Sequence, residues 1–309
     1  MCLILLGDWW IPTIEVSPLD LTQSIQATAL IGLGFALLEG VFPFHTWVTM
    51  LAENSHPFAL SYVLFTLPMA IGLVSLIYLE SITQLKIAPI VYSVLQIGGA
   101  MLVAFAGLWA ALQNHLGRIL GFAVIAQIGL AMIVFSLPAL SEYELLFLGI
   151  YFALLVPHGL SLAIWGLSLN IIRSRFGDLT FDSVLGAGRI LPIATSGLII
   201  SNLSSAGLPL LASFPVFVIL WNALSAQSLI AALIALLGSA CLLIAGLRSL
   251  AVLTQLKGET YPLWQVSENP YQATLLILGV FALIAVGLLP QLFLTPLINM
   301  AFGYTSPGP

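Results

Sequence analysis

The chain has 309 residues, of which 61% are hydrophobic and only 6% are Asp, Glu, Lys or Arg, and its formal net charge is −5. Soluble domains carry about 25% charged residues, so a chain this apolar cannot cover its surface in water. We therefore expect an integral membrane protein with lipids as neighbours. The seven Lys and Arg residues are scattered along the chain, which excludes a nucleic-acid-binding surface.

Eight apolar runs predict an all-α, polytopic bundle of transmembrane helices that forms one domain over residues 1–309. Each run is long enough, at about 1.5 Å of rise per residue, to cross a hydrocarbon core of about 30 Å. The sixth run contains Gly207, Pro209 and Pro215, so it predicts a broken helix, which is tolerated where it is buried in protein or lines a polar cavity. The predicted spans cover residues 22–43, 58–79, 88–113, 118–137, 145–172, 190–222, 228–255 and 271–300.

The basic residues predict the orientation of the bundle. With eight spans both termini lie on one side, where the loops contain Lys86 as their only basic residue. Cytoplasmic loops carry an excess of Lys and Arg, so both termini are expected on the positive, periplasmic or lumenal side. The loops of the opposite side hold Arg118, Arg173, Arg175, Arg189 and Lys257.

Ionisable residues inside the spans are the first candidates for function, because they are expensive in hydrocarbon. Glu39, near the end of the first span, fits either an acid that reaches interfacial water or a proton-relay carboxylate. His158, in the fifth span, fits a proton relay or a structural hydrogen bond. Arg248, in the seventh span, is always charged and needs a partner, so an ion pair or a lipid phosphate explains it better than catalysis.

A polar cluster surrounds the predicted turn between the third and fourth spans. It includes His115, a third relay candidate, together with Arg118 and Gln127, which we expect to be structural. The chain shows no nucleophile–base arrangement, phosphate-binding loop or paired carboxylates, so we expect no catalytic residue. Its two cysteines, Cys2 and Cys241, form no C-x-x-C motif, and no second histidine is suitably spaced from His158, so we also expect no metal or cofactor site in this chain.

Several motifs, in order along the chain, carry a family resemblance. Residues 42–47 (FPFHTW) resemble the signature of the antiporter-like membrane subunits of complex I, which are related to Mrp-type cation/proton antiporters and membrane-bound hydrogenases. Other segments are similar to later motifs of that family in the same order. These are Pro57 with Ser61, residues 113–129 (QNHLGRILGFAVIAQIG) with Arg118 retained, residues 158–160 (HGL), residues 186–192 (GAGRILP), residues 207–209 (GLP) followed by Phe214, Arg248, and residues 287–290 (GLLP).

The resemblance implies a truncated, degenerate member that corresponds to the last eight helices of a fourteen-helix fold. It implies a membrane-arm subunit of a complex I-like proton-translocating NAD(P)H or ferredoxin:quinone oxidoreductase, not catalytic alone. The implied partners are the other membrane subunits, and quinone and iron–sulfur clusters would reside on them. The implied location is a bacterial inner membrane or a thylakoid-type membrane.

The departures from the family pattern concern its proton channel. Glu39 neighbours one of the replaced positions, but one residue is about 100° around a helix, so it is not a simple substitute. Without charged groups water has less reason to enter, and the central axis is expected to be dry. The turn loses an Asp and a Lys, and a histidine after it becomes Gln127. Apolar residues stand where the family carries channel lysines or glutamates: Leu38, about Met69 or Ala70, Leu162 and Phe217.

Three functions remain open from the sequence. The first is a structural subunit whose own proton channel is lost or reduced. The second is an active proton-conducting subunit with a rerouted path through Glu39 and His158. The third, from a different class, is an independent secondary transporter, which the broken sixth span would fit.

Overall fold

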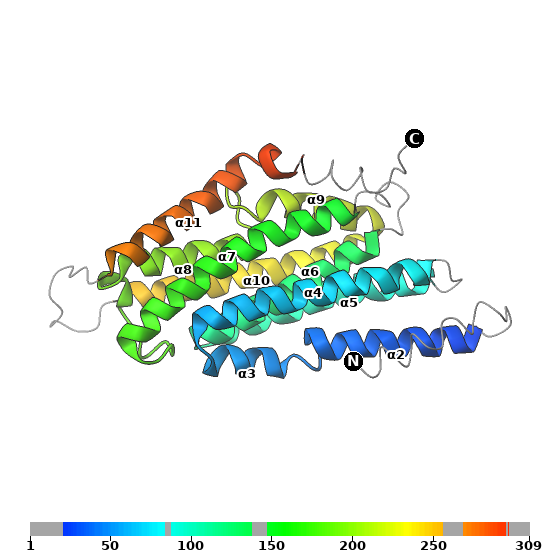
Figure 1. The fold of residues 1–309 in the computed structure, drawn as a ribbon, viewed down its shortest axis with the longest axis horizontal. Coiled ribbons are helices and arrows are strands. Elements are labelled where there is room, and N and C mark those ends of the chain that lie inside the picture. Colours follow the sequence, from blue (N-terminus) through cyan, green and yellow to red (C-terminus); the bar gives the residue numbers. More distant parts are fainter. Residues whose placement is uncertain (1–20, 84–87, 138–146, 256–267, 295, 297–309) are drawn as a thin grey trace.

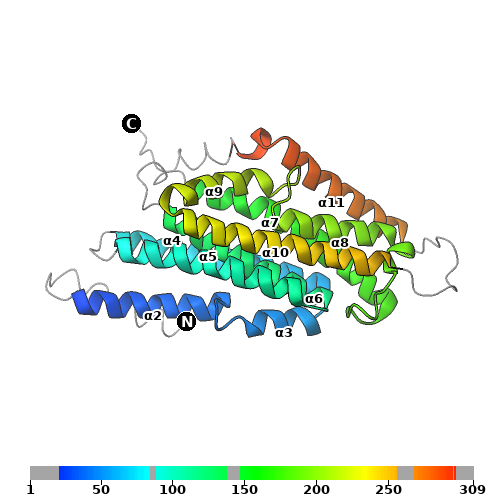
Figure 2. The same ribbon diagram turned by 180° about the vertical axis from the view of Figure 1, so that it is seen from behind.

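The computed structural model describes residues 21–83, 88–137, 147–255, 268–294 and 296, and in these ranges it contains helices and no strand. The all-α class is therefore confirmed. The long helices run roughly side by side in one elongated bundle, with α2 along one edge and α11 crossing the opposite edge (Figures 1 and 2). The helices are α2 (Leu21–Glu39), α3 (Thr46–Asn54), α4 (Pro57–Thr83), α5 (Ala88–Leu112), α6 (Leu116–Ser136), α7 (Phe147–Phe176), η2 (Ala187–Arg189), α8 (Pro192–Ser205), α9 (Phe214–Gln227), α10 (Leu229–Thr254) and α11 (Pro270–Leu288).

Six helices among the described residues are long and apolar enough to cross a membrane: α4, α5, α6, α7, α10 and α11. Two shorter apolar helices, Ile25–Glu39 and Phe214–Gln227, belong to interrupted spans. The predicted last span, 271–300, contains α11, which ends at Leu288, and the predicted end of the span lies outside the described residues. Lys86 and Lys257 also lie outside the described residues.

Helix α6 forms the centre of the bundle, and nearly all its residues are buried. The close contacts of α5 with α6 and with α10 depend on pairs of glycines. A Cβ atom on Gly99 of α5 would lie 2.6 Å from the carbonyl oxygen of Gly129 on α6, and one on Gly107 would lie 2.1 Å from that of Gly238 on α10. Small residues let the backbones approach, which is how membrane helices gain packing energy without a hydrophobic driving force.

The first span is not the single helix predicted over 22–43. Helix α2 ends at Glu39, Gly40 follows in the left-handed region with φ +72°, and a new helix, α3, begins at Thr46. Gly40 ends the helix without steric cost, and Pro43 cannot donate the hydrogen bond that a continuing helix needs. In Figure 1, α2 and α3 lie end to end along the same edge, so the span is a broken helix.

The second broken helix is the predicted one. Helix α8 ends at Ser205 and α9 begins at Phe214, and both Gly207 and Pro209 lie between them. Pro215 lies instead in the first turn of α9, a position where its missing N–H costs nothing. Gly207 has φ +82°, a conformation that favours glycine.

Five arginines lie on helix ends and turns that meet at one end of the bundle. This end brings together the start of α6, the end of α7, η2 and the last turns of α10. We call it the basic end. Its arginines are Arg118, Arg173, Arg175, Arg189 and Arg248.

Candidate functional site

Glu39 and His158, far apart in the sequence, line the same internal cavity. The cavity has a volume of about 30 Å³ and lies among α2, α4, α6 and α7. Its other polar lining residues are Gln127 of α6 and Tyr151 of α7, and Gly72 of α4 also lines it. A Cβ atom on Gly72 would lie 2.1 Å from the Tyr151 hydroxyl oxygen, so only glycine leaves room for that hydroxyl.

The cavity lies near the middle of the bundle rather than at an end. Met69 and Gln127, which line it, are close to the midpoints of α4 and α6. Glu39, the last residue of α2, is at the same height because the first span breaks there. This position argues against the alternative that Glu39 is an acid at the membrane interface. The physical reason is the helix break, which stops α2 halfway along the bundle.

Two of the side chains that line this cavity have a polar atom without a hydrogen-bond partner among the described residues. His158 Nδ1 and Gln127 Oε1 are buried without a hydrogen-bond partner within the described part of the chain. The Gln127 Nε2 group donates to the Ser205 carbonyl oxygen at 3.0 Å, and the Tyr151 hydroxyl donates to the Met69 carbonyl oxygen at 3.4 Å. A cavity needs about 10–15 Å³ and two to four polar partners to hold a water molecule. This cavity meets both conditions, so the packing leaves room for water at this height, and the dry axis stays a prediction.

A second cavity, of about 140 Å³, also reaches Glu39. It follows α2 from Thr28 to Glu39, a distance of about 16 Å at the rise of an α-helix. Its walls are mainly apolar, with Thr28, Ser75 and Tyr78 as the other polar residues. It extends from Glu39 toward the end of the bundle opposite the basic end. The Glu39 side chain thus lies between two cavities.

Comparison with protein families identifies the fold. The family model described as "NADH:quinone oxidoreductase/Mrp antiporter, TM" matches residues 13–243, more than half of the chain. The chain belongs to this family. It is 27% identical over 190 residues to formate hydrogenlyase subunit 3 of Escherichia coli (strain K12). The matched segment covers 59% of this chain and 31% of that protein. It is 30% identical over 216 residues to NADH-quinone oxidoreductase subunit N of Rhodopseudomonas palustris (strain BisA53), 69% of this chain and 45% of that protein.

Solved structures share the fold of this antiporter-like chain. A chain of the archaeal membrane-bound sulfane sulfur reductase superposes with a TM-score of 0.82 at 16% identity, covering 97% of this chain and 62% of its own length. A chain of the Mrp complex from Dietzia sp. DQ12-45-1b gives 0.77 at 18% identity, with coverages of 97% and 65%. The chain spans less than half of the length of the two curated relatives above.

Two positions that the family motifs align with channel lysines or glutamates are packed with hydrocarbon. Leu162 of α7 and Phe217 of α9 are each 1% exposed. The Phe217 ring covers the second helix break, because a Cβ atom on Gly207 would lie 2.3 Å from its Cδ2 atom. Trp221 packs edge-on against the same ring at a centroid distance of 5.7 Å. The second break therefore contains an aromatic plug where a charged side chain was expected for the family.

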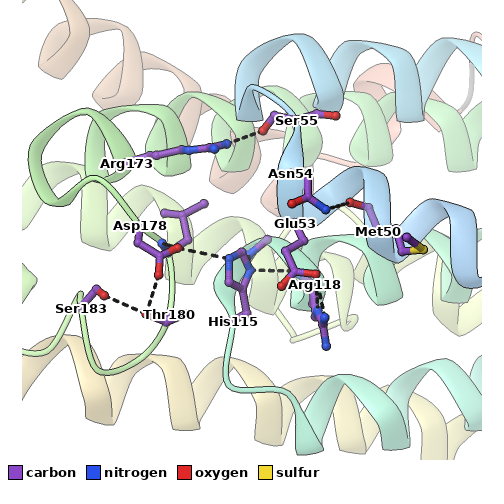
Figure 3. A network of polar contacts seen from close by, with 12 residues as sticks. Met50, Glu53, Asn54, Ser55, His115, Arg118, Arg173, Asp178, Thr180 and Ser183 are labelled. Atoms are coloured by element: carbon purple, nitrogen blue, oxygen red, sulfur yellow. Dashed lines mark hydrogen bonds and ion pairs between the residues drawn. The ribbon is translucent and has the colours of Figure 1, made fainter.

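His115 lies at the basic end, outside the Glu39 cavity, and caps α6 (Figure 3). Its Nδ1 accepts hydrogen bonds from the backbone N–H groups of Gly117 at 3.1 Å and Arg118 at 3.4 Å, while its Nε2 lies 3.7 Å from Asp178 Oδ1. Burial lowers the pKa of His115, although the carboxylates of Glu53 and Asp178 act in the opposite direction. An unprotonated Nδ1 is what the helix cap requires.

The same end ties α3 to the rest of the bundle. Arg118 donates from Nε and Nη2 to Glu53 Oε2 on α3, at 2.9 and 2.7 Å (Figure 3). Arg173 of α7 donates to the carbonyl oxygen of Ser55, just after α3, at 2.5 Å. The retained family residue Arg118 is thus part of a structural contact. No local pattern points to Glu53 as its partner, because the two residues, 65 positions apart, meet only in the tertiary fold.

Arg248 finds a different partner from the predicted ion pair. It donates to the backbone carbonyl oxygen of Ala111 and, at 2.9 Å, to Asn114 Oδ1, and its guanidinium lies 5.7 Å from the centre of the Phe181 ring. Carbonyl groups at the end of a helix are unpaired and carry partial negative charge, so they suit an arginine. Arg248 therefore closes the C-terminal end of α5. No carboxylate pairs with it among the described residues.

Proposed function

We propose that this chain is a membrane-arm subunit of a complex I-like, proton-translocating quinone oxidoreductase, with a proton path reduced to one hydrated site at Glu39 and His158. The observation that carries the proposal is the shared cavity of these two residues, lined also by Gln127 and Tyr151. Quinone and iron–sulfur clusters would be held by partner subunits. The basic end would face the negative side of a bacterial inner or thylakoid-type membrane.

Proton exchange at this site needs only groups that are present. Protonated His158 gives up its Nδ1 proton to a water molecule in the cavity, and that water molecule gives one of its own protons to an oxygen of the Glu39 carboxylate. The second cavity connects Glu39 toward the opposite end of the bundle. Glu39 and His158 line the cavity from different helices, α2 and α7, so their protonation states determine whether a proton is held or passed on.

The experiment measures protons translocated per electron by the intact complex in proteoliposomes. Glu39→Gln keeps the shape of the side chain but removes its charge, and His158→Ala removes the second acceptor. Both variants are expected to lower the ratio while electron transfer continues in uncoupled membranes. Asp182→Asn, a carboxylate replacement at an exposed position of the basic end, is the matched control and leaves the ratio unchanged.

A purely structural subunit is the second candidate. It is favoured by the hydrocarbon packing around Leu162 and Phe217, since each is 1% exposed. An unchanged ratio in both Glu39→Gln and His158→Ala would select this candidate. An independent transporter has less in its favour, because the second break, on which that alternative relied, is plugged by the Phe217 ring.

A further inference from the structure

Helix α7 carries a stripe of buried polar side chains that begins at His158. His158, Ser161, Trp165 and Ser168 follow one another at intervals of three or four residues, so they share one face of the helix. Their exposed fractions are 8%, 0%, 1% and 0%. Three of them have a polar atom without a hydrogen-bond partner in the described part of the chain: His158 Nδ1, Trp165 Nε1 and Ser168 Oγ.

Helix α8 supplies the facing side of this stripe. Figures 1 and 2 both show α7 and α8 side by side. The Ser161 hydroxyl donates to the Ser204 hydroxyl of α8 at 3.1 Å. Farther toward the basic end, a Cβ atom on Gly197 of α8 would lie 2.7 Å from Ser168 Oγ, so the Ser168 hydroxyl packs directly against the backbone of this glycine.

The stripe ends near a half-buried carboxylate. Glu268 Oε1 accepts hydrogen bonds from the N–H groups of Ile193 at 2.9 Å and Ala194 at 2.8 Å, and so caps α8. Its other oxygen, Oε2, is buried without a partner within the described ranges. Ala194 is about one helical turn from Gly197, which borders Ser168. The row from His158 to Ser168 is itself about 15 Å long at the rise of an α-helix.

Buried polar atoms that find no protein partner are normally bound to ordered water, and in the interior of a membrane protein each such atom is costly if left alone. We propose that ordered water molecules fill the row between α7 and α8, and that Glu268 is the carboxylate through which protons reach His158 from the basic end. The proposal rests on the proposed proton site at Glu39 and His158, and adds the route that supplies it. The route runs between α7 and α8, away from the Phe217 plug.

The chemistry of the row requires no oxidant, reductant or co-reactant. A proton from the aqueous side binds Glu268, whose charge is favoured by the positive end of α8. Each hydroxyl or water then forms one O–H bond on its Glu268 side as it gives up another on its His158 side. Glu268 returns to its carboxylate form, and His158 Nδ1 gains the proton. Trp165 only donates from its N–H group, so it orients a water molecule and passes no proton.

The first test is structural and does not depend on proton pumping. A cryo-electron-microscopy map of the intact complex, at a resolution that resolves water, is expected to show density within hydrogen-bond distance of four atoms. These are His158 Nδ1, Trp165 Nε1, Ser168 Oγ and Glu268 Oε2. A dry row at that resolution overturns the inference and leaves the Glu39 cavity untouched.

The second test is functional. Glu268→Gln keeps an oxygen that can cap α8, but its amide group cannot exchange protons. Ser168→Val puts a methyl group where the hydroxyl lies beside Gly197, and so removes that link of the row. Both are expected to lower the protons translocated per electron to the value of Glu39→Gln. Ser239→Ala is the control, because that buried hydroxyl on α10 bonds its own helix at Ala235.

The variants separate the two proposals. If Glu39→Gln lowers the ratio but Glu268→Gln and Ser168→Val do not, the route is wrong and the proposed function stands. If Glu39→Gln itself has no effect, the proposed function fails, and the route fails with it even where water density is found.

Discussion

The first broken helix, α2 with α3, and the second, α8 with α9, each interrupt a membrane-spanning path with a short non-helical segment. Local turns satisfy backbone groups in both. The Val41 N–H donates to the Ala36 carbonyl oxygen at 2.9 Å, and the Leu208 N–H donates to that of Leu203 at 3.0 Å. A break therefore does not by itself require water or an ion, and the nearby side chains decide what it becomes.

Those side chains differ completely between the two breaks. Glu39 ends α2 and opens onto two cavities, whereas the Phe217 ring fills the space against Gly207. The first break is a candidate polar site and the second a packed joint. The same fold can thus have an apolar residue, Phe217, at the second break and a titratable residue, Glu39, at the first.

The largest effect is expected from an added methyl group at Gly207. Gly207→Ala forces a left-handed alanine and pushes Cβ into the Phe217 ring, for a combined cost of about 2–5 kcal/mol. Gly40→Ala also places alanine in the left-handed region, but its nearest neighbours are side-chain atoms of Val48 and Trp47 that can shift, so about 1–2 kcal/mol is expected. Thermal unfolding in detergent measures both.

Gly32→Ala is the control, because a Cβ atom at this position in α2 would meet nothing within 4 Å. It should be neutral or slightly stabilising, since alanine favours a helix more than glycine does. Equal losses for Gly207→Ala and Gly40→Ala would remove the distinction between a packed joint and a loosely filled one.

The sequence predicted the second break but not the first, although both contain Gly and Pro. Gly207 and Pro209 interrupt a run of 33 residues that is too long for one simple span, whereas Gly40 falls where a first span would end anyway. Glu39 was therefore open to interpretation as an interfacial acid. The helix-boundary motifs and the apolar run lengths were enough for the fold class and the family, because both depend on local composition.

The site itself depended on tertiary contacts that no local pattern contains. The sequence singled out Glu39 and His158 as a candidate pair because both are ionisable groups within spans, but only the structure shows that they line one cavity. Tyr151 carries no such signal, because a tyrosine in an apolar span is unremarkable in composition. The stripe of Ser161 and Ser168 did have a signal, their helical spacing from His158, but serines in membrane helices usually bond their own backbone. Their lack of such bonds is visible only in the structure.

A smaller, pH-dependent effect is expected where α3 packs on the start of α6. Burial lowers the folded-state pKa of His115 below 6.5, so the unfolded chain binds its proton more readily. The stabilisation by the neutral cap is complete above about pH 6.5 and is lost as the pH falls through the lowered pKa. Amide exchange in the first turn of α6 and in α3 should speed up over that range. No such change in amide exchange is expected at α9, because its buried residues pack in an apolar cluster.

His115→Asn separates the cap from the titration. Asparagine is a good N-cap and does not titrate in this range. The variant should therefore keep slow amide exchange above pH 6.5 and at the lower pH values where His115 becomes protonated. If acid-dependent exchange at α3 persists in His115→Asn, another group controls it. Asp178 does not, because hydrogen bonds from the Leu179 N–H and the Thr180 hydroxyl lower its pKa below 3.8.

The smallest effect concerns the ion pair that fastens α3. The Arg118 and Glu53 side chains are 44% and 31% exposed, so their coupling in a double-mutant cycle with Arg118→Gln and Glu53→Gln should be about 0.2–1 kcal/mol. Because salt screens exposed charges, the coupling should shrink as the ionic strength rises. Phe217→Leu, which loosens α9 by removing apolar contacts, should give a loss that salt does not weaken. If the stability loss of Phe217→Leu shrinks with salt as the coupling at α3 does, polar contacts hold α9 as well. The contrast between the two broken helices is then confined to Glu39 and Phe217.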